Sequence, residues 1–312
     1  MTPPTYADVL EAETRLQGLI RNTPIHTCET LDRLAGRELF FKCENFQKTG
    51  SFKYRGATNA IQKLDAATAS RGVVTHSSGN HAQALALAAK VRGITAHVVM
   101  PHTASPIKKQ AVLGYGGIVI ECEPTLTDRE RAAIEIVART GGTLIPPFDH
   151  PDVIAGQGTA ALELLNQVPQ LDSIVVPVGG GGMISGYCLA AAGAAPQVKI
   201  IGAEPLEADD ASRSLASGER QPAKPPTSIA DGLLTSLGDL TWPIIREQVS
   251  VIHTVTEAEI RAAMRLVWER MKLVIEPSAA VGVTVALRER NLGQRVGVVL
   301  CGGNVSLDKL PW

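Results

Sequence analysis

The sequence predicts an α/β protein built on parallel sheets, and three observations support this fold class. Short apolar stretches alternate with helical stretches along most of the chain, as expected for parallel strands covered by helices on both faces. Polar or glycine-rich segments follow several of the predicted strands, where open α/β sheets bind their ligands. The 312 residues exceed what one hydrophobic core usually organises, so two units are expected.

The N-terminal part of the chain supplies one helix and one strand ahead of the alternating region. A helical pattern runs from Tyr6 to about Leu19 and cannot extend past Pro24. The apolar run at 39–41 predicts a strand, and the residues from Gly56 onward predict the start of a helix. The segment between them is therefore a strand-to-helix junction.

The alternation that defines the fold class follows this junction in two series. In the first series, strands are predicted at 72–75, 97–100, 118–120 and 143–145, and helices at 80–91, 105–113 and 128–139. In the second series, helices are predicted at 153–168 and 183–192, and strands at 173–176 and 198–201. Strands and helices that succeed one another in this way indicate βαβ units.

The C-terminal part returns to the same pattern after a break. Residues 217–226 are polar and rich in proline, which predicts a surface loop. Thr256 and Glu259 have the spacing of a capping box and start a helix that reaches about Met271. The last predicted elements are a helix at 279–290, a strand at 296–300 and a loop at 301–304.

Composition argues against several classes of function. The formal net charge of -1 gives no electrostatic case for nucleic acid or an anionic membrane as the main partner. No apolar run approaches the ~20 residues that span a bilayer, and the acidic N-terminal segment lacks the apolar centre of an export signal. Five cysteines without a CxxC pair suit reduced thiols, so a cytoplasmic protein is expected.

A lysine at the strand-to-helix junction is the first candidate for chemistry. Lys53 follows the small residues 49–51 and lies between Phe52 and Tyr54. Bulky neighbours can partly desolvate such an amine, which lowers its pKa and frees it for covalent chemistry with a carbonyl group. A solvated lysine at a helix N-terminus is the alternative, and this segment alone favours it.

Four consecutive glycines form the strongest local signal. They occupy 179–182, directly after the predicted strand at 173–176 and at the start of the next helix. Unobstructed backbone amides at the positive end of a helix bind phosphate. The spacing is neither GxGxxG nor GxxxxGKS/T, which argues against a dinucleotide fold and a P-loop NTPase. A tight strand-to-helix turn is the alternative, but such a turn needs one or two glycines rather than four.

Two further polar loops follow predicted strands. The Ser-Ser-Gly-Asn-His segment at 77–81 offers hydroxyl and amide groups to a ligand, although Ser and Asn are also favoured helix caps. The loop at 301–304 begins with Cys301, and a cysteine there is more often a small buried residue than a functional thiol. Glu276 precedes a predicted helix, where capping would also explain it.

Carboxylates and histidines give weaker signals. Glu204 and Asp210 follow the strand at 198–201, and oxygen ligands of this kind suit a hard divalent cation, although acidic loops are common. The histidines lack HxxxH and HExxH spacing, which argues against a catalytic zinc site. No GxSxG elbow is present, so a serine-hydrolase triad is not expected.

The lysine, the phosphate loop and the Ser/Asn loop together suit pyridoxal 5′-phosphate, an aldehyde cofactor that carries a phosphate. The chain closely resembles the fold-type II family of enzymes that use this cofactor, in the serine/threonine dehydratase group, and most of all its branch of serine racemase and threo-3-hydroxyaspartate dehydratase. Five ordered segments carry the resemblance, namely 47–53 (QKTGSFK), 77–81 (SSGNH), 154–159 (IAGQGT), 179–183 (GGGGM) and 301–304 (CGGN). Segments 266–272 and 275–277 are similar to the racemase branch.

The resemblance implies a fold like that of tryptophan synthase β, with two open parallel-sheet α/β domains and the cofactor between them. Residues 1–62 and 147–312 would form a large cofactor-binding domain, and residues 63–146 a small domain. A homodimer is also implied.

The resemblance assigns contacts to the cofactor. Lys53 would hold it as a Schiff base, with Phe52 packed near the ring and Asn80 beside the 3′-oxygen. Cys301 would meet the pyridine nitrogen, with Glu276 nearby, and a neutral group at this nitrogen fits elimination better than transamination. The residues that would bind the phosphate are Gly179, Gly180, Gly181, Gly182 and Met183.

For the substrate, the resemblance implies two acid–base groups. Lys53 would remove the α-proton, and Ser78 would act from the opposite face, the arrangement that racemisation requires. Arg129 or His150 could pair with a second carboxylate, as in 3-hydroxyaspartate. The residues expected to hold the α-carboxylate are Ser77, Ser78, Gly79, Asn80 and His81.

A cation site is implied as well. Glu204, the carbonyl of Ala208 and Asp210 match the family's ligands for a divalent cation, which would be Mg²⁺, Ca²⁺ or Mn²⁺.

The activity implied is β-elimination of a β-hydroxy amino acid, such as L-serine, L-threonine or threo-3-hydroxyaspartate, to a 2-keto acid and ammonia, with serine racemisation beside it. Three alternatives stay open. They are serine racemisation as the main activity, a β-replacement enzyme of the same fold such as a cysteine synthase, and a phosphate-ligand binding protein without catalysis. In each enzymatic case the partner is a small amino acid.

Overall fold

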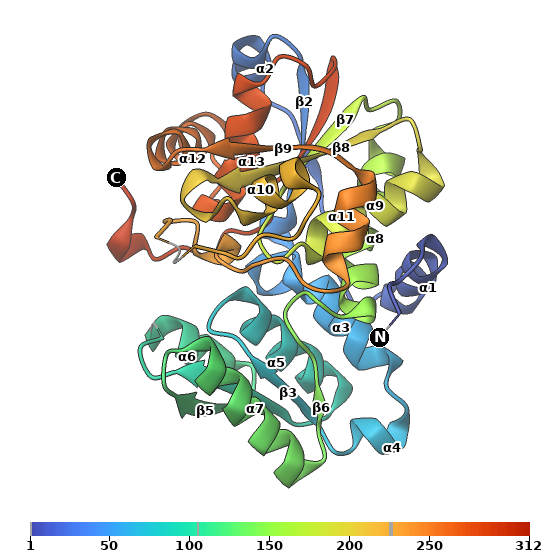
Figure 1. Ribbon diagram of the computed structural model, residues 1–312, viewed down its shortest axis with the longest axis vertical. Helices are drawn as coiled ribbons and strands as arrows, with labels where there is room; N and C mark the ends of the chain where they lie inside the picture. Colours follow the sequence, from blue (N-terminus) through green and yellow to red (C-terminus); the bar gives the residue numbers. More distant parts are fainter. Residues whose placement is uncertain (1, 105, 225–226) are drawn as a thin grey trace.

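The strands that the structure describes form two separate sheets, one of six strands and one of four, which lie in different halves of the molecule (Figure 1). The computed structural model describes residues 2–104, 106–224 and 227–312. The sheets have the orders β1-β2-β10-β7-β8-β9 and β5-β4-β3-β6. Among the strands described, every neighbouring pair is parallel except β1 with β2. The predicted α/β class with parallel sheets is confirmed, with an antiparallel edge strand added.

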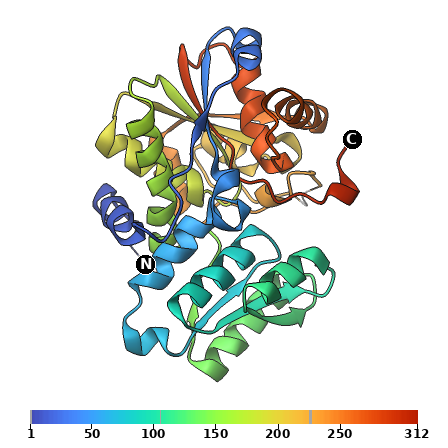
Figure 2. The same ribbon diagram turned by 180° about the vertical axis from the view of Figure 1, so that it is seen from behind.

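The six-stranded sheet contains strands from segments that lie far apart in the sequence. Its strands are β1 (Ile25–His26), β2 (Glu38–Lys42), β7 (Ser173–Pro177), β8 (Lys199–Pro205), β9 (Val249–Val255) and β10 (Arg295–Val299). Strand β2 lies beside β10, with Lys42 paired to Val299 (Figure 2). Strand β7 is buried along its whole length, as its apolar composition requires of a central strand.

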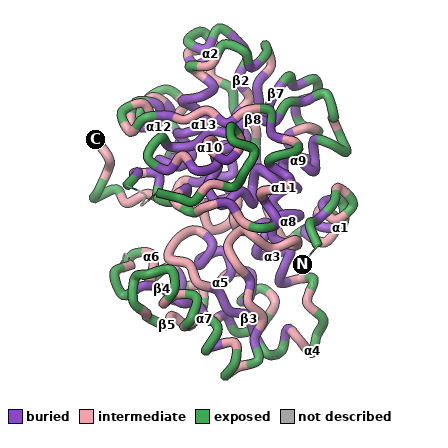
Figure 3. The backbone as a smooth tube through the Cα atoms, in the orientation of Figure 1, coloured by how far each residue is buried: buried purple, intermediate pink, exposed green. Residues whose placement is uncertain are grey.

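Helices cover both faces of this sheet. Gly282 of α13 lies against Val175, whereas Leu164 of α8 reaches Gly297 beside Ile174. Because successive residues of a strand point to opposite faces, α8 and α13 lie on opposite sides. Figure 3 shows the buried residues gathered along α8, α9 and α13. The helices of this half are α1 (Tyr6–Leu16), α2 (Glu29–Ala35), α8 (Pro151–Gln167), α9 (Gly182–Ala194), α10 (Asp210–Ser217), α11 (Thr241–Gln248), α12 (Glu257–Met271) and α13 (Pro277–Arg288).

The four-stranded sheet is covered in the same way. Its elements are β3 (Val73–His76), α5 (Asn80–Arg92), β4 (Ala96–Pro101), α6 (Pro106–Gly114), β5 (Ile118–Cys122), α7 (Leu126–Thr140) and β6 (Thr143–Leu144). Helices α5 and α6 share a core with Val98 and Met100. Helix α7 packs through Ile136 against Val74 and Val99, which face the other way.

Helix α3 (Lys53–Lys63) lies between the two halves. Tyr54 and Ile61 belong to a core that also contains Val73 and residues of α5. On its other side α3 meets α8 so closely that a Cβ added to Gly156 would lie 2.7 Å from the Cα of Gly56. The domain boundaries predicted at 62/63 and 146/147 fall at the end of α3 and in the connection from β6 to α8, and they stay predictions.

Several elements were not predicted from the sequence. These are β1, α2, α4 (Ala66–Ala69), α10, α11 and β9. Helix α11 contains Pro243, which a first turn tolerates but which obscures a helical pattern. Helix α3 begins at Lys53, three residues before the predicted start. Ser105, Pro225 and Pro226, which belong to a predicted helix and a predicted loop, lie outside the described residues.

Among the residues that the structure describes, none of the helices is long and apolar enough to cross a bilayer.

Candidate active site

The Lys53 amine is the centre of the site. Lys53 is the first residue of α3, and its Nζ donates a hydrogen bond to the Pro147 carbonyl oxygen at 2.7 Å. The amine lies 5.2 Å from the centre of the Phe52 ring. Burial lowers the pKa of the Lys53 amine to about 8, while the Glu276 carboxylate acts in the opposite direction. This is the environment that the sequence predicts for a reactive lysine.

The residues before Lys53 are clamped to the loop at 301–304. The Phe52 amide donates to the Cys301 carbonyl at 3.0 Å, and Ser51 forms a β-bridge with Gly302. The Asn304 side-chain amide donates to the Thr49 carbonyl at 2.7 Å. This clamp fixes where α3 begins, and therefore where the Lys53 side chain starts.

A buried ion network holds the first turn of α3 from behind. Arg55 is fully buried and donates to Glu44 at 2.7 and 2.8 Å and to Glu163 at 2.7 and 2.8 Å. Lys42 donates to the same Glu163 at 2.7 Å. Two cations thus bind two carboxylates, and each Arg55 bond to these carboxylates is charge-assisted and short. The network ties α3 to β2 and to α8 at a position two residues after Lys53.

Each glycine of the 179–182 loop is required by the segments that pack on it. A Cβ at Gly179 would lie 2.9 Å from the Cα of Leu233, and one at Gly180 would lie 2.5 Å from the Phe148 ring. Gly181 has a φ of +88°, which glycine adopts without strain. The sequence predicts open amides here, and the close approach of other segments is a second reason for four glycines.

The same loop also presents open amides. Gly181 is the N-cap of α9 and has no side chain with which to cap the helix. Gly182 and Met183, the first helical residues, are buried. Buried amides at a helix N-terminus need a partner, and a phosphate group supplies one.

The turn at 77–81 lies between β3 and α5. The Ser77 amide donates to the Val99 carbonyl at 3.1 Å, and the Gly79 amide donates to the Ser77 hydroxyl at 3.3 Å. Ser78 is half-buried in this turn. His81 is buried and places Nε2 3.1 Å from the Ile145 carbonyl oxygen. Burial and the nearby Lys53 charge lower the His81 pKa to about 3, so this imidazole is neutral.

Asn80, Glu276 and Asn304 form one hydrogen-bonded cluster that joins the two halves. The Asn80 side-chain amide donates to the Glu276 carboxylate at 2.9 Å, and the Asn304 side-chain amide donates to the Asn80 oxygen at 2.8 Å. Burial and the charge of Asp231 raise the Glu276 pKa to about 7, against the hydrogen bond from Asn80. The cluster therefore brings together two predicted cofactor contacts, Asn80 and Glu276, and Asn304 completes it.

Cys301 is buried next to this cluster. Burial, and then the Glu276 charge, raise the pKa of its thiol well above the ordinary value. The thiol is accordingly uncharged.

The side chains of Arg129 and His150 are engaged at helix N-termini. Arg129 donates to the Thr125 carbonyl at 3.4 Å in the first turn of α7. His150 is the N-cap of α8, and its Nδ1 accepts the Asp152 amide at 3.2 Å. Their pairing with a second substrate carboxylate stays a prediction.

The predicted cation ligands lie together at the end of β8. Glu204 is buried and accepts the amides of Ala211 and Ser212 at 2.9 and 2.8 Å, yet burial raises its pKa to about 8. Asp210 is buried, and its Oδ2 has no hydrogen-bond partner among the residues described. Over the described ranges no group of three or more His, Cys, Asp or Glu residues could hold a metal ion. Two carboxylates and the Ala208 carbonyl are thus the available donors.

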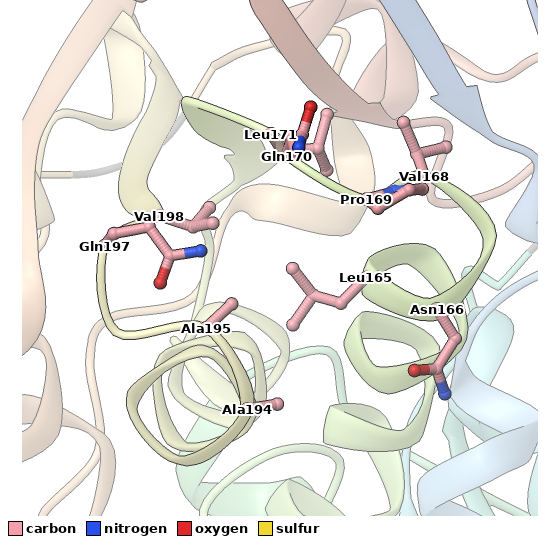
Figure 4. A pocket seen from close by; sticks show the side chains of 10 residues that line it. All are labelled: Leu165, Asn166, Val168, Pro169, Gln170, Leu171, Ala194, Ala195, Gln197 and Val198. Carbon is pink, nitrogen blue, oxygen red and sulfur yellow. The ribbon is translucent and has the colours of Figure 1, made fainter.

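A cavity of about 210 Å³ lies where α8 and α9 end (Figure 4). Its residues precede β7 and β8, so it lies at the end of the six-stranded sheet opposite to the glycine loop. None of the described residues that line it has an ionisable side chain, so this lining offers no acid–base chemistry. The residues that line it are Leu165, Asn166, Val168, Pro169, Gln170, Leu171, Ala194, Ala195, Gln197 and Val198.

Sequence reasoning missed several residues that shape the site. Arg55 stands two positions after Lys53 in the QKTGSFKYR segment, and an arginine this close to a reactive lysine was an available signal. Pro147 acts through its carbonyl, and Thr241 donates its hydroxyl to the Gly180 carbonyl at 2.9 Å. Neither contact has a signal in the sequence, because both depend on how distant segments pack.

The residues present fit pyridoxal phosphate. A desolvated amine, a loop of buried amides at a helix N-terminus and an uncharged thiol suit an aldehyde, a phosphate and a ring nitrogen respectively. The Oγ of Ser51, close to Lys53 in the chain, is buried and has no hydrogen-bond partner among the described residues, so it is a further polar atom available to a ligand.

Comparisons with known proteins agree with this fit. The family model described as "Pyridoxal-phosphate dependent enzyme" matches residues 16–302. The chain is 52% identical to beta-hydroxyaspartate dehydratase of Paracoccus denitrificans (strain Pd 1222), over 99% of both chains, and 50% identical to serine racemase of Dictyostelium discoideum, over 99% of this chain and 98% of the racemase. The structure of maize serine racemase superposes with a TM-score of 0.97 at 43% identity, over 98% of this chain and 95% of the other. The chain therefore belongs to the pyridoxal-phosphate dependent enzymes, in the fold-type II branch that contains the serine racemases.

Proposed function

We propose that the protein eliminates water from a β-hydroxy amino acid, such as L-serine, L-threonine or threo-3-hydroxyaspartate, and that hydrolysis of the released enamine gives a 2-keto acid and ammonia. The observation that carries the proposal is the Lys53 amine, which has a pKa of about 8 and is held 2.7 Å from a backbone carbonyl. Relatives named beta-hydroxyaspartate dehydratase and L-threo-3-hydroxyaspartate ammonia-lyase, at 52% and 46% identity, support this substrate class.

Lys53 has two tasks in this proposal. Its amine would hold the cofactor aldehyde until the substrate amine takes its place, and the freed Nζ would then take the proton from the substrate α-carbon. The bound cofactor supplies an electron-withdrawing ring that stabilises the negative charge left on that carbon. A fall of the pKa from 10.5 to about 8 raises the neutral, proton-accepting fraction of the amine at pH 7 about 300-fold.

Other residues hold the reacting groups. The loop from Gly179 to Met183 binds the phosphate through its amides, which anchors the cofactor near Lys53. Asn80 and Phe52 contact the ring, and the uncharged Cys301 thiol meets its nitrogen. The Asn80–Glu276 bond keeps Asn80 in place between the two halves.

The turn at 77–81 holds the substrate. Backbone amides and Ser and Asn side chains of residues 77–81 bind the α-carboxylate. Because the Ser77 and Gly79 amides already donate to Val99 and Ser77, the amides at the start of α5 and the side chains supply most of the donors. Arg129 or His150 pairs with the second carboxylate of 3-hydroxyaspartate. Preference for this substrate over serine depends on that pair.

Serine racemisation is the second candidate activity. It requires an acid–base group on each face of the α-carbon, and the half-buried Ser78 is available to face Lys53. Relatives named serine racemase, at 48–50% identity, support it.

The remaining proposals concern the whole protein. Glu204, the Ala208 carbonyl and Asp210 hold Mg²⁺, Ca²⁺ or Mn²⁺, and the Asp210 oxygen that lacks a partner among the described residues supports this. The protein is a cytoplasmic homodimer, with a large domain of residues 1–62 and 147–312 and a small domain of residues 63–146.

One set of assays tests the activity. The enzyme with bound cofactor is incubated separately with L-serine, D-serine, L-threonine and threo-3-hydroxyaspartate, and keto acid, ammonia and the serine enantiomers are measured. We expect keto acid and ammonia in equal amounts from at least one substrate. Absence of keto acid from all four would contradict the proposal, and turnover of O-acetylserine with sulfide would indicate β-replacement instead.

A further inference from the structure

Residues 146–150, which belong to the connection from β6 to α8, touch both parts of the proposed cofactor site. The Pro147 carbonyl accepts the hydrogen bond from the Lys53 amine at 2.7 Å. The ring of the next residue, Phe148, packs on the glycine loop, where a Cβ added to Gly180 would lie 2.5 Å from it. One short segment therefore sets the distance between the reactive lysine and the glycine loop.

Asp149, which follows Phe148, caps a distant helix. Its carboxylate accepts the backbone amides of Asp239, Leu240 and Thr241 at 2.9, 2.9 and 3.3 Å, at the start of α11. A Cβ on Gly238 would overlap this carboxylate, so the turn before α11 is shaped around it. A carboxylate at a helix N-terminus is stabilised by the amides and by the helix dipole.

Thr241 connects this capped turn to the glycine loop. Its hydroxyl donates to the Gly180 carbonyl at 2.9 Å and accepts the Gly238 amide at 2.8 Å. A Cβ on Gly181 would lie 2.8 Å from the Thr241 Cβ, so the loop rests directly on this residue. The contacts thus run from Asp149 through Thr241 to Gly180.

We propose that Asp149 is a positioning residue for the phosphate-binding loop, acting through Thr241. The inference rests on the proposed function, in which the 179–183 loop binds the cofactor phosphate. Asparagine in place of Asp149 keeps one acceptor oxygen but turns an N–H donor toward a backbone amide. The turn before α11 then shifts, and the Gly180 carbonyl shifts with Thr241.

The experiment compares Asp149→Asn with a matched control, Asp172→Asn. Asp172 also accepts two backbone amides, those of Gln294 and Arg295 at 2.6 and 2.9 Å, and a Cβ on Gly293 would overlap it. It precedes β7, at the end of that strand opposite to the glycine loop. Each protein is stripped of cofactor and titrated with pyridoxal phosphate, and the ³¹P NMR signal of the bound phosphate is recorded.

We expect Asp149→Asn to bind the cofactor about tenfold more weakly, as the loss of one charge-assisted hydrogen bond implies, with a shifted ³¹P signal. Asp172→Asn should keep the wild-type affinity and signal. A folded Asp149→Asn protein with wild-type affinity and ³¹P signal would overturn the inference. If this variant does not fold, Thr241→Val decides by the same two measurements. Failure of the wild-type protein to bind pyridoxal phosphate would instead contradict the proposed function.

Discussion

The position and the pKa of the Lys53 amine depend on the segments that surround this residue. The loop at 301–304 clamps the residues before it, and the Pro147 carbonyl receives its amine. Burial then lowers the pKa of the amine to about 8. Lys63, on the same helix, pairs with Asp152 near the surface at 2.7 Å and shares none of these features.

Replacing Lys53 by alanine tests this assignment. We expect Lys53→Ala to lose the absorbance of the lysine-bound cofactor and to lower turnover by about 10³-fold, because the anchor and the base disappear together. Borohydride reduction should link cofactor to the wild-type chain but not to this variant. Lys63→Ala is the control and should keep both properties, and a Lys53→Ala protein with normal turnover would exclude Lys53 from the chemistry.

Glu204 makes the stability of the protein depend on pH. Its pKa is about 8 in the folded protein against an ordinary value of 4.5, so the folded state binds a proton that the unfolded state releases. The stabilisation is complete below pH 4.5 and is lost as pH rises through 8. The free energy of unfolding should fall between pH 5.5 and pH 8, and we expect this fall to be about 1–3 kcal/mol smaller in Glu204→Gln than in the wild-type protein. Denaturant unfolding in EDTA at the two pH values measures it.

The same carboxylate predicts a pH-dependent response to cations. A divalent cation needs the deprotonated Glu204, so Mg²⁺, Ca²⁺ or Mn²⁺ should raise the Tm of the wild-type protein more at pH 8 than at pH 5.5. Glu207→Gln, a change at an exposed position of the same segment, should leave this response intact. Equal Tm values with EDTA and with each cation at pH 8 would remove Glu204 and Asp210 from a cation site.

At the level of elements, α3 depends on the buried network around Arg55. Arg55 is the largest fully buried side chain of the described residues, and it satisfies Glu44 and Glu163 together. Removing one partner of such a network leaves uncompensated buried charge, which costs far more than the network contributes as a whole.

Arg55→Met tests this dependence. We expect the free energy of unfolding to fall by about 3–5 kcal/mol, since Glu44 and Glu163 lose their shared partner. Arg131→Met is the control, because Arg131 forms an exposed pair with Asp128 on α7, and exposed pairs contribute about 0–1 kcal/mol. Equal losses in the two variants, measured by denaturant unfolding, would contradict the role given to the network.

The elements also show what the sequence can and cannot predict. Strands such as β7, with three consecutive β-branched apolar residues, and the capping box at Thr256 and Glu259 carry local signals and were predicted. Lys53, the glycine loop and the 77–81 turn could be singled out because adjacent residues in the sequence carry the relevant chemical groups, and their roles stay predictions. The capping of α11 by Asp149 was missed because it joins residues 90 or more positions apart, and no local pattern encodes such a contact.

At the level of the whole molecule, the site is assembled from both halves. Asn80 begins α5 beside the four-stranded sheet, whereas Glu276 and Asn304 come from the other half. The connection at 146–150 adds Pro147 and Phe148 between them. A ligand that binds here would contact residues of both halves, and it would therefore add to the contacts that hold the halves together.

Removing the cofactor should accordingly destabilise the whole protein. At a cofactor concentration of about 100 times Kd, bound ligand contributes about 2.7 kcal/mol, which corresponds to a Tm about 4 °C above that of the stripped protein. Hydrogen exchange should become faster in both the 77–81 turn and the 146–150 connection. Equal Tm values, or faster exchange in one half only, would contradict a site shared by both.

The pairing of β2 with β10 gives the protein an order of assembly during synthesis. All strands of the four-stranded sheet lie between residues 73 and 144, so they can pair while the ribosome is still making the rest. Strand β2 has no parallel neighbour until residues 295–299 emerge, and the clamp on Lys53 waits for 301–304. Until residues 295–304 have been made, a nascent chain therefore lacks the contacts that hold the backbone before Lys53, and the amine has the pKa of an ordinary lysine.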